Sequence, residues 1–227
     1  MPRTKDDWIR EYQAKDALWI HDRHPKRPHA LLASGKHSNG YFNSRLVIPD
    51  EDLLREAARG LIASFALHSI RLGRIDGIVG PQTGATKLAE FMSDEIEDIT
   101  QDACFSASPA KAGEGDAKSM VFNDENLAIL RGATVLLCED VLTTGGSVEL
   151  TAKAVTDAGG IVLPFICALV NRSGLTEVDG KKIVALIDKS MPMWTPEECS
   201  LCKEGSEAIR PKDTEPQNNW ARLNATY

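Results

Sequence analysis

The sequence predicts an α/β fold in which a mainly parallel central sheet is flanked by helices. Apolar strands without polar interruption recur from about residue 75 onward, and helical segments separate them. Strands of this kind are buried on both faces, which is typical of parallel sheets covered by helices. With 227 residues, 42% of them hydrophobic and 26% charged, the chain has ordinary globular composition and sufficient length for one or two domains.

The N-terminal part is expected to contain two helices joined by a linker. Residues 5–20 predict a loosely amphipathic helix, because they carry apolar side chains at Trp8, Ile9, Tyr12, Leu18 and Trp19. Residues 21–29 are polar and contain two prolines, which indicates a linker. Apolar residues recur at spacings of three and four over 51–67, which predicts a helix with Asp50 as its N-cap.

From residue 75 the sequence alternates between expected strands and expected helices. The strands are expected at 75–80, 102–107, 133–140, 161–170 and 181–188, and the helices at 84–99 and 147–159. Residues 119–122 are expected to pair with 102–107 as a hairpin across a glycine-containing loop. After residue 188 this alternation is lost, and no regular element is assigned there.

Charge and cysteine content exclude several classes of protein. The 26 basic and 33 acidic residues give a formal net charge of −7, which argues against binding a nucleic-acid backbone as the main function. No apolar run approaches the roughly 18 residues of a membrane span, and the N-terminal residues do not resemble a signal peptide. Five cysteines, an odd number, favour a reducing compartment, so we expect a cytoplasmic protein without membrane or nucleic-acid partners.

Two adjacent carboxylates, Glu139 and Asp140, end the strongest strand of the sequence. The next turn, at residues 143–147, reads Thr-Thr-Gly-Gly-Ser and opens a helix. Ligands of open α/β sheets bind beyond the carboxyl ends of strands, and a helix N-terminus offers N–H groups that suit a phosphate. The two acids suit vicinal sugar hydroxyls or a divalent metal. The segment therefore predicts a site for a phosphorylated sugar; the alternative is an acid-ended core strand followed by a capped helix.

Four segments carry a resemblance to a known family. Residues 135–147, VLLCEDVLTTGGS, resemble the phosphoribosyl-pyrophosphate (PRPP) signature of type I phosphoribosyltransferases. Three further segments resemble the orotate branch of that family: LLASGKHSNGYF at 31–42, VGPQTG at 79–84 and VNRSG at 170–174. The resemblance covers about residues 28–190. It implies a type I phosphoribosyltransferase-like fold as a single domain over 1–227, with a core at about 50–190 and a small hood from about 1–48 and 190–227.

The resemblance also implies a role for each matching residue. The ribose hydroxyls would be held by Glu139 and Asp140, the 5′-phosphate by residues 143–147, and the pyrophosphate by the loop at 80–84. The residues implied to bind PRPP are Gly80, Pro81, Gln82, Thr83, Gly84, Glu139, Asp140, Val141, Leu142, Thr143, Thr144, Gly145, Gly146 and Ser147. Those implied to bind the base are Ser34, Gly35, Tyr41, Phe42 and Arg172.

The base-site residues have plainer interpretations when the resemblance is set aside. A guanidinium such as that of Arg172 can pair bidentately with a carboxylate such as that of orotate. From the residues alone, Arg172 is instead a charge on a surface loop, and Tyr41 and Phe42 are packing residues.

The chain departs from the family pattern at positions that are usually basic. A mobile loop of the family carries an Arg-Lys pair followed by a lysine three residues later. Alignment of residues 105–111 on that loop places Ala107 and Ser108 at the pair and retains only Lys111, which with Asp140 is assigned a catalytic role. Lys118, on the same glycine-rich loop, is the rival candidate.

Two further departures concern the base segment and the pyrophosphate loop. Ala33 stands where many members have a lysine before the Ser-Gly pair, and Gly84 stands where many have a lysine in the pyrophosphate loop. Lys87, three residues beyond Gly84, is not an obvious replacement.

The implied reaction joins orotate to PRPP and yields orotidine 5′-monophosphate and pyrophosphate, a step of pyrimidine synthesis. The leaving pyrophosphate gains negative charge, which calls for cations such as Mg²⁺ or lysine. Mg²⁺ would bind through PRPP, with Glu139 and Asp140 as possible protein ligands. The family implies a homodimer in which Lys111 acts on the neighbouring subunit. The alternatives are a phosphoribosyltransferase for another base, suggested by Ala33, and a PRPP-binding regulator without catalysis.

Cys199 and Cys202 form a Cys-x-x-Cys motif outside the segments described above. A structural zinc site needs four ligands as a rule, and the sequence offers no second Cys-x-x-Cys or His-x-x-x-His motif nearby. Zinc would therefore require a distant cysteine or histidine, or a second subunit. Packing or a turn is the simpler interpretation, and a redox pair is a further one.

Overall fold

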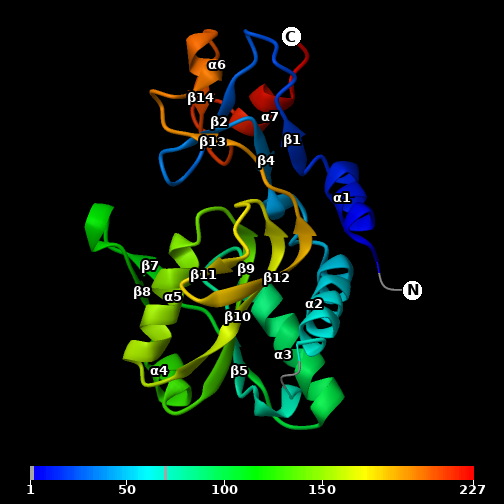
Figure 1. The fold of residues 1–227 in the computed structure, drawn as a ribbon, viewed down its shortest axis with the longest axis vertical. Helices are drawn as coiled ribbons and strands as arrows, with labels where there is room; N and C mark the ends of the chain where they lie inside the picture. Colours follow the sequence, from blue (N-terminus) through cyan, green and yellow to red (C-terminus); the bar gives the residue numbers. More distant parts are fainter. Residues whose placement is uncertain (1–2, 69–70) are drawn as a thin grey trace. The chain divides into compact units, whose positions relative to one another are not determined.

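The chain divides into two units in the computed structural model, which describes residues 3–68 and 71–227. Unit 1 comprises Met1–Trp8 and Ile48–Lys189, and unit 2 comprises Ile9–Val47 and Ser190–Tyr227. Unit 2 is therefore built from both ends of the chain, which Figure 1 shows as interleaved blue and orange-to-red segments. Among the described residues, no helix is both long enough and apolar enough to cross a membrane.

A six-stranded sheet forms the centre of unit 1. Its strands are β5 (Gly77–Val79), β6 (Phe105–Ala107), β9 (Thr134–Leu142), β10 (Ile161–Asn171), β11 (Glu177–Val178) and β12 (Lys181–Asp188). They lie in the order β11-β12-β10-β9-β5-β6, and every neighbouring pair is parallel except β11 with β12. The predicted α/β fold with a mainly parallel central sheet is confirmed.

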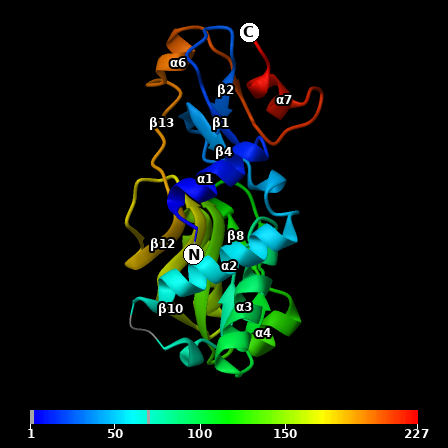
Figure 2. The same cartoon turned by 90° about the vertical axis from the view of Figure 1, so that its right-hand side faces the viewer.

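Helices cover both faces of this sheet (Figures 1 and 2). They are α2 (Glu51–Ala66), α3 (Thr86–Thr100), α4 (Asp124–Leu130) and α5 (Gly146–Asp157). Unit 1 also contains two short 3₁₀ helices, η2 (Leu72–Arg74) and, between β7 and β8, η3 (Gly115–Ala117). The predicted N-cap of α2 is confirmed, because the Asp50 side chain accepts a hydrogen bond from the Leu53 N–H at 3.1 Å. Seven apolar residues of α2 are buried, as its spacing of three and four requires.

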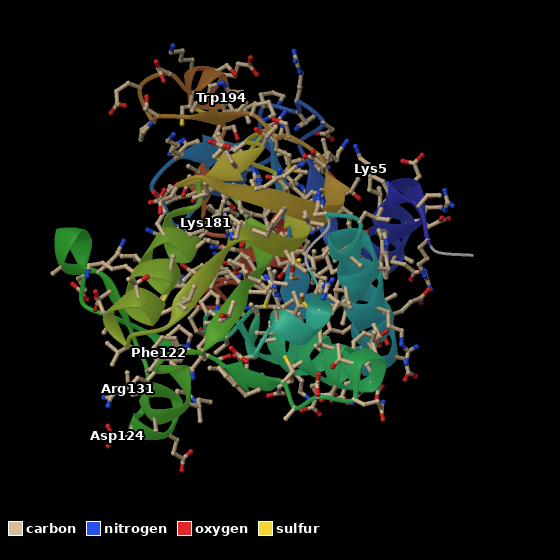
Figure 3. All side chains as sticks on the ribbon, turned by 60° about the horizontal axis from the view of Figure 1, so that its bottom comes forward. Lys5, Phe122, Asp124, Arg131, Lys181 and Trp194 are labelled. Carbon is tan, nitrogen blue, oxygen red and sulfur yellow. The ribbon has the colours of Figure 1, made fainter. Side chains whose placement is uncertain are left out.

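The helix α5 packs its apolar side against alternate residues of the central strands. Val148, Ala152 and Val155 join a buried cluster with Val135 and Leu137 of β9. Because successive side chains of a strand point to opposite faces, Leu136 and Cys138 belong to the other face, where Cys138 contacts the carbonyl of Ala85 just before α3. Asp124 and Arg131, at the two ends of α4, are exposed at the periphery of the unit in Figure 3.

The predicted pairing of residues 119–122 with 102–107 is wrong. β8 (Ser119–Val121) pairs instead with β7 (Ala110–Ala112) in an antiparallel hairpin, while β6 pairs with β5 in the central sheet. Pro109 separates β6 from β7, and proline cannot donate to a strand ladder, so a new strand begins after it. At the hairpin's turn, Gly113 has a φ of +73°, and a Cβ there would run into the carbonyl of Ala117.

Unit 2 contains short strands and helices from both chain ends. These are β1 (Leu18–Ile20), β2 (His29–Leu31), β3 (His37–Ser38), β4 (Gly40–Phe42), η1 (Ser44–Leu46), β13 (Met193–Trp194), α6 (Ser200–Lys203), β14 (Ala208–Ile209) and α7 (Asn219–Asn224). One sheet has the order β13-β3-β2-β14, and β1 pairs separately with β4. Strands from the N-terminal segment thus pair directly with strands from the C-terminal segment.

The single helix predicted over residues 5–20 is only partly correct. α1 (Lys5–Ala14) ends before Asp16, whose φ of +50° is left-handed, and the chain then enters β1. Leu18 and Trp19 pair with β4, and the Trp19 Nε1–H donates to the carbonyl of Leu223 at 2.8 Å. Tertiary pairing to these distant residues replaces the last helical turns.

Candidate active site

Three neighbouring strands of unit 1 end at one edge of the sheet. β5, β9 and β10 are parallel to one another, so their carboxyl ends meet at the same edge. The loop 80–84 follows β5, and Arg172 follows β10. The acid pair, Glu139 and Asp140, lies in the last four residues of β9, and the turn 143–147 comes directly after that strand. The Arg172 N–H donates to the carbonyl of Leu142 at 3.0 Å. The structure therefore brings together all the residues that were assigned to PRPP, with Arg172 beside them.

The acid pair at the end of β9 consists of one buried and one half-buried carboxylate. Glu139 is only 7% exposed, and Asp140 is half-buried. Burial raises the pKa of Glu139 well above its usual range, and the neighbouring charge of Asp140 raises it further, whereas the positive charge of Lys111 opposes the increase. Lys111 on β7 is therefore close enough to this pair to act on it electrostatically.

Replacement of Glu139 by glutamine is expected to stabilise the protein at neutral and alkaline pH. Because the pKa of Glu139 is higher in the folded protein than in the unfolded chain, its contribution to stability is present at low pH and is lost as the pH rises through the folded-state pKa. Thermal unfolding across pH should show a higher Tm for Glu139→Gln in that range, by about 2–4 °C for each kcal/mol.

The difference should disappear below about pH 4, where the glutamate is protonated in both states. Glu177→Gln, at an exposed position of β11, is the matched control and should leave Tm unchanged. A Glu139→Gln protein that is less stable than the wild type at every pH would show that the carboxylate, and not its proton, holds the fold together here.

The loop 80–84 is fixed against the segment that leads to Lys111. The Gly80 N–H donates to the carbonyl of Ala107 at 3.2 Å. The Gln82 N–H donates to the carbonyl of Pro109 at 3.0 Å, and its side-chain amide donates to the carbonyl of Ser108 at 3.1 Å. These bonds hold the loop beside the strand β7 that carries Lys111.

Asp140 lies directly against Gly84 of this loop. A Cβ built on Gly84 would be 2.6 Å from Cγ of Asp140, so any side chain at position 84 requires the carboxylate to move. This contact gives a physical reason for glycine at a position where many family members have lysine. Lys87 does not replace that lysine, because it forms an ion pair with Glu51 of α2.

Residues 143–147 wrap the N-terminus of α5. Gly145 is the N-cap, with a φ of +89°, and a Cβ there would come within 2.7 Å of Val178. A left-handed backbone and this close approach both require glycine. The first N–H groups of a helix have no partner within the helix, so this turn presents donors and a partial positive charge at the edge of the sheet.

Arg172 is buried rather than exposed, with 1% of its surface accessible. The interpretation of Arg172 as a surface loop charge is therefore wrong. The preceding Asn171 fixes the loop: its side-chain oxygen accepts from the Ser173 hydroxyl at 2.6 Å, and its amide donates to the carbonyl of Leu175 at 2.8 Å. The loop that carries Arg172 is thus held by side-chain hydrogen bonds.

The other residues assigned to the base belong to unit 2. Ser34 and Gly35 are exposed in the turn between β2 and β3, where Gly35 has a φ of +80°. Tyr41 is half-buried, with its ring 6.0 Å from that of Trp220. Phe42 is 2% exposed and packs edge-on against Tyr12 at 5.2 Å, as the packing interpretation requires. The base-site assignments are therefore divided between the units, with Arg172 alone in unit 1.

The two candidate loop lysines have different positions in the β7–β8 hairpin. Lys111 lies within β7, opposite Met120 of β8, and its side chain is exposed. Lys118 lies beyond η3, just before β8. Of the two, Lys111 is the one whose charge lowers the pKa of Glu139. The segment that was aligned on the family's mobile loop, residues 105–111, contains β6 and the first part of β7.

Unit 2 contains a second cluster of reactive side chains, whose closeness the sequence does not predict. His29, His37, Cys199 and Cys202 bring four potential ligand atoms within 4.8 Å of one another. The Cys-x-x-Cys motif was the only signal for it, because the two histidines belong to the opposite end of the chain.

Comparison with known proteins gives consistent similarities. The phosphoribosyl transferase domain model matches residues 51–196. The orotate phosphoribosyltransferase of Heliobacterium modesticaldum is 33% identical over 183 residues, covering 81% of this chain and 88% of that protein. The orotate phosphoribosyltransferase of Pelotomaculum thermopropionicum is 32% identical over 208 residues, covering 92% and 97%. The crystal structure of orotate phosphoribosyltransferase from Aeropyrum pernix is similar in fold, with a TM-score of 0.53, 20% identity, and coverage of 79% and 93%.

Proposed function

The chain belongs to the phosphoribosyltransferase family, and from this premise we propose that it is an orotate phosphoribosyltransferase. It would transfer the 5-phosphoribosyl group of PRPP to orotate, giving orotidine 5′-monophosphate and pyrophosphate. The observation that carries the proposal is the meeting of Asp140, the loop 80–84 and the turn 143–147 at one sheet edge. Similarity to orotate phosphoribosyltransferases over more than four-fifths of the chain supports orotate as the base.

Two parts of the segment 139–147 would bind PRPP, one at its ribose and the other at its 5′-phosphate. The turn 143–147 would donate backbone N–H and hydroxyl groups to the 5′-phosphate, in the field of the N-terminus of α5. Glu139 and Asp140, three residues earlier, would accept hydrogen bonds from the ribose hydroxyls. The strand end and the glycine turn thus fix the distance between the residues that would bind the ribose and those that would bind the 5′-phosphate.

The reaction breaks the bond between the ribose and pyrophosphate, whose oxygen keeps the electron pair. A ring nitrogen of orotate bonds to the same ribose carbon, and its N–H bond breaks with release of the proton to water. The loop 80–84 would bind the departing pyrophosphate through its N–H groups, and Lys111 would compensate the charge that it gains. The hydrogen bonds between this loop and residues 107–109 would couple the position of Lys111 to that of the pyrophosphate.

The acid pair has the donors that Mg²⁺ requires. Carboxylate oxygens are hard ligands that suit this ion, and Glu139 and Asp140 supply them at the edge of the sheet. We propose that the ion binds mainly through PRPP oxygens, with Asp140 as the more accessible protein ligand. When bound, Mg²⁺ neutralises negative charge on the pyrophosphate.

Orotate would be recognised by its carboxylate. Arg172 has a planar, permanently charged fork that matches a carboxylate bidentately; because its side chain is only 1% exposed, orotate would reach it only when the groups that cover it move. Ser34, Gly35 and Tyr41 are proposed as further contacts with the base. Because the ring of Phe42 is buried against Tyr12, a contact from Phe42 would be made through its backbone.

A panel of bases tests the identity of the acceptor. Purified protein is incubated with PRPP, Mg²⁺ and, separately, orotate, uracil, adenine, guanine or hypoxanthine, and nucleotide formation is measured. Orotate is expected to be the preferred acceptor by kcat/KM, and Arg172→Lys is expected to weaken this preference, because an ammonium cannot reproduce the bidentate pairing. Preferred use of another base would overturn the assignment of orotate while leaving the phosphoribosyltransferase family intact.

Assembly and location complete the proposal. Resemblance to the family supports a homodimer, and the odd number of cysteines supports a reducing cytoplasm. The core of about 50–190 and the hood of about 1–48 and 190–227 are proposed to act together as one catalytic domain.

A further inference from the structure

The four side chains of the second cluster are almost completely enclosed within unit 2. His29 and Cys199 are 0% exposed, His37 is 6% exposed, and Cys202 is half-buried. His29 begins β2 and His37 begins the neighbouring β3, whereas Cys199 caps α6 and Cys202 lies within it. Figure 1 shows these elements side by side, the strands in blue and α6 in orange. Two ligands therefore come from each end of the chain.

The distances within the cluster match the edges of a tetrahedron around zinc. Nε2 of His29 is 3.0 Å from Nδ1 of His37 and 3.5 Å from each Sγ of Cys199 and Cys202. Sγ of Cys202 is 3.2 Å from Nδ1 of His37. With Zn–N and Zn–S bonds of ordinary length, a tetrahedral site has N···N edges of about 3.3 Å and N···S edges of about 3.6 Å.

Hydrogen bonds outside the cluster leave a lone pair of His29 directed into it. The Ser206 hydroxyl donates its single hydrogen to the carbonyl of Arg27 at 2.6 Å. Its oxygen, 2.8 Å from Nδ1 of His29, must therefore accept from an Nδ1–H. Nε2 then carries no hydrogen, and its one lone pair faces three ligand atoms. Metal-binding histidines characteristically have such a partner, which fixes the ring and its tautomer.

We propose that unit 2 contains a structural zinc site with His29 Nε2, His37 Nδ1, Cys199 Sγ and Cys202 Sγ as ligands. A central cation satisfies all four atoms at once, which hydrogen bonds among them do not, because a single lone pair accepts one hydrogen bond. Two thiolates and two imidazoles in a closed, buried arrangement are typical of structural Zn²⁺. The ion would link the β2–β3 hairpin to the C-terminal segment, and its existence does not depend on the proposed catalytic function.

A structural zinc ion would stabilise unit 2, because the apolar core of this unit is small. Among the described residues, the apolar cluster that joins the two chain ends has five buried members, namely Trp19, Ala30, Leu32, Ile209 and Leu223, with Tyr41, Met193 and Trp220 packed against them. Small cores of this kind are commonly supplemented by a metal. The strands β3, β13 and β14 have only two residues each, so their pairing supplies few hydrogen bonds.

Metal analysis of the full-length protein, purified without chelator, tests the proposal. We expect about one zinc per chain, and replacement by Co²⁺ should give the intense visible absorption of tetrahedral thiolate-bound cobalt. Cys202→Ser should lose at least half of the bound zinc and the cobalt spectrum. Cys104→Ser is the matched control, since Cys104 is a buried free cysteine of unit 1, and it should keep both.

Measurements on the wild-type protein test the zinc proposal even if a variant that lacks a ligand fails to fold. Removal of zinc by a strong chelator should lower Tm, and added Zn²⁺ should restore it without PRPP or orotate present. Absence of zinc from protein prepared in zinc-supplemented medium would overturn the proposal. So would a mass 2 Da lower than that of the reduced chain without metal, which indicates a disulfide between Cys199 and Cys202. Equal zinc content in Cys202→Ser and wild type would do the same.

Discussion

Asp140→Asn is expected to lower kcat/KM for PRPP by about 10- to 150-fold, the equivalent of one charge-assisted hydrogen bond of about 1.5–3 kcal/mol. Asp140 lies two residues before the end of β9 with its carboxylate against Gly84, so in the proposed complex it would lie between the ribose of PRPP and the pyrophosphate loop. Asparagine keeps the size of the side chain but loses the charge that accepts from a hydroxyl and attracts Mg²⁺. Steady-state kinetics with varied PRPP at saturating orotate measure the effect.

Asp157→Asn is the matched control for this substitution. Asp157 ends α5 and forms an exposed ion pair with Lys153, so its replacement removes the same charge without touching the site. Exposed pairs of this kind contribute little to stability, and kcat/KM should stay within a factor of two of the wild type. An Asp140→Asn enzyme with unchanged kcat/KM would contradict the assignment of the acid pair to ribose.

Lys111→Ala is expected to lower kcat at least about tenfold, because it removes a cation from the developing charge of the pyrophosphate. The KM for orotate should change little. Lys118→Ala, at the far side of the same hairpin, removes an equal charge and should retain most of kcat. If only Lys118→Ala lowers kcat, the alignment of the loop is wrong.

Co-expression of Lys111→Ala with Asp140→Asn determines which subunit Lys111 serves. The resemblance to the family predicts action on the partner. If Lys111 instead serves its own chain, where its charge lowers the pKa of Glu139, mixing the two defective proteins restores no activity. Recovery of about a quarter of wild-type activity would instead indicate action on the partner, because half of a random mixture of dimers is mixed and each mixed dimer has one intact site.

Three strands of the central sheet, β9, β10 and β12, are predictable because each contains a long apolar run. The strand predicted at 181–188 is found at Lys181–Asp188, and the helix predicted at 51–67 is found at Glu51–Ala66. The hairpin of β7 and β8 is not predictable from apolar runs, because its strands have three residues each and β7 is mostly exposed. Short strands carry too few side chains for a period to be recognised.

The two sites differ in predictability for a similar reason. The residues proposed for PRPP lie in contiguous segments after predicted strands, so the parallel sheet alone brings them to one edge. The closeness of Gly84 to Asp140, which explains the missing lysine, depends on loop geometry that no spacing reveals. The metal cluster joins Cys199 to His29 across 170 residues, and the pairing of β14 with β2 and of β13 with β3 brings the two ends of the chain together.

The products that purified protein forms from PRPP, orotate and Mg²⁺ distinguish an orotate phosphoribosyltransferase from a PRPP-binding regulator. We expect orotidine 5′-monophosphate and pyrophosphate to appear in equal amounts over many turnovers, and Asp140→Asn to slow both equally. Binding of PRPP without any orotate-dependent release of pyrophosphate would contradict the proposed function and favour a PRPP-binding regulator.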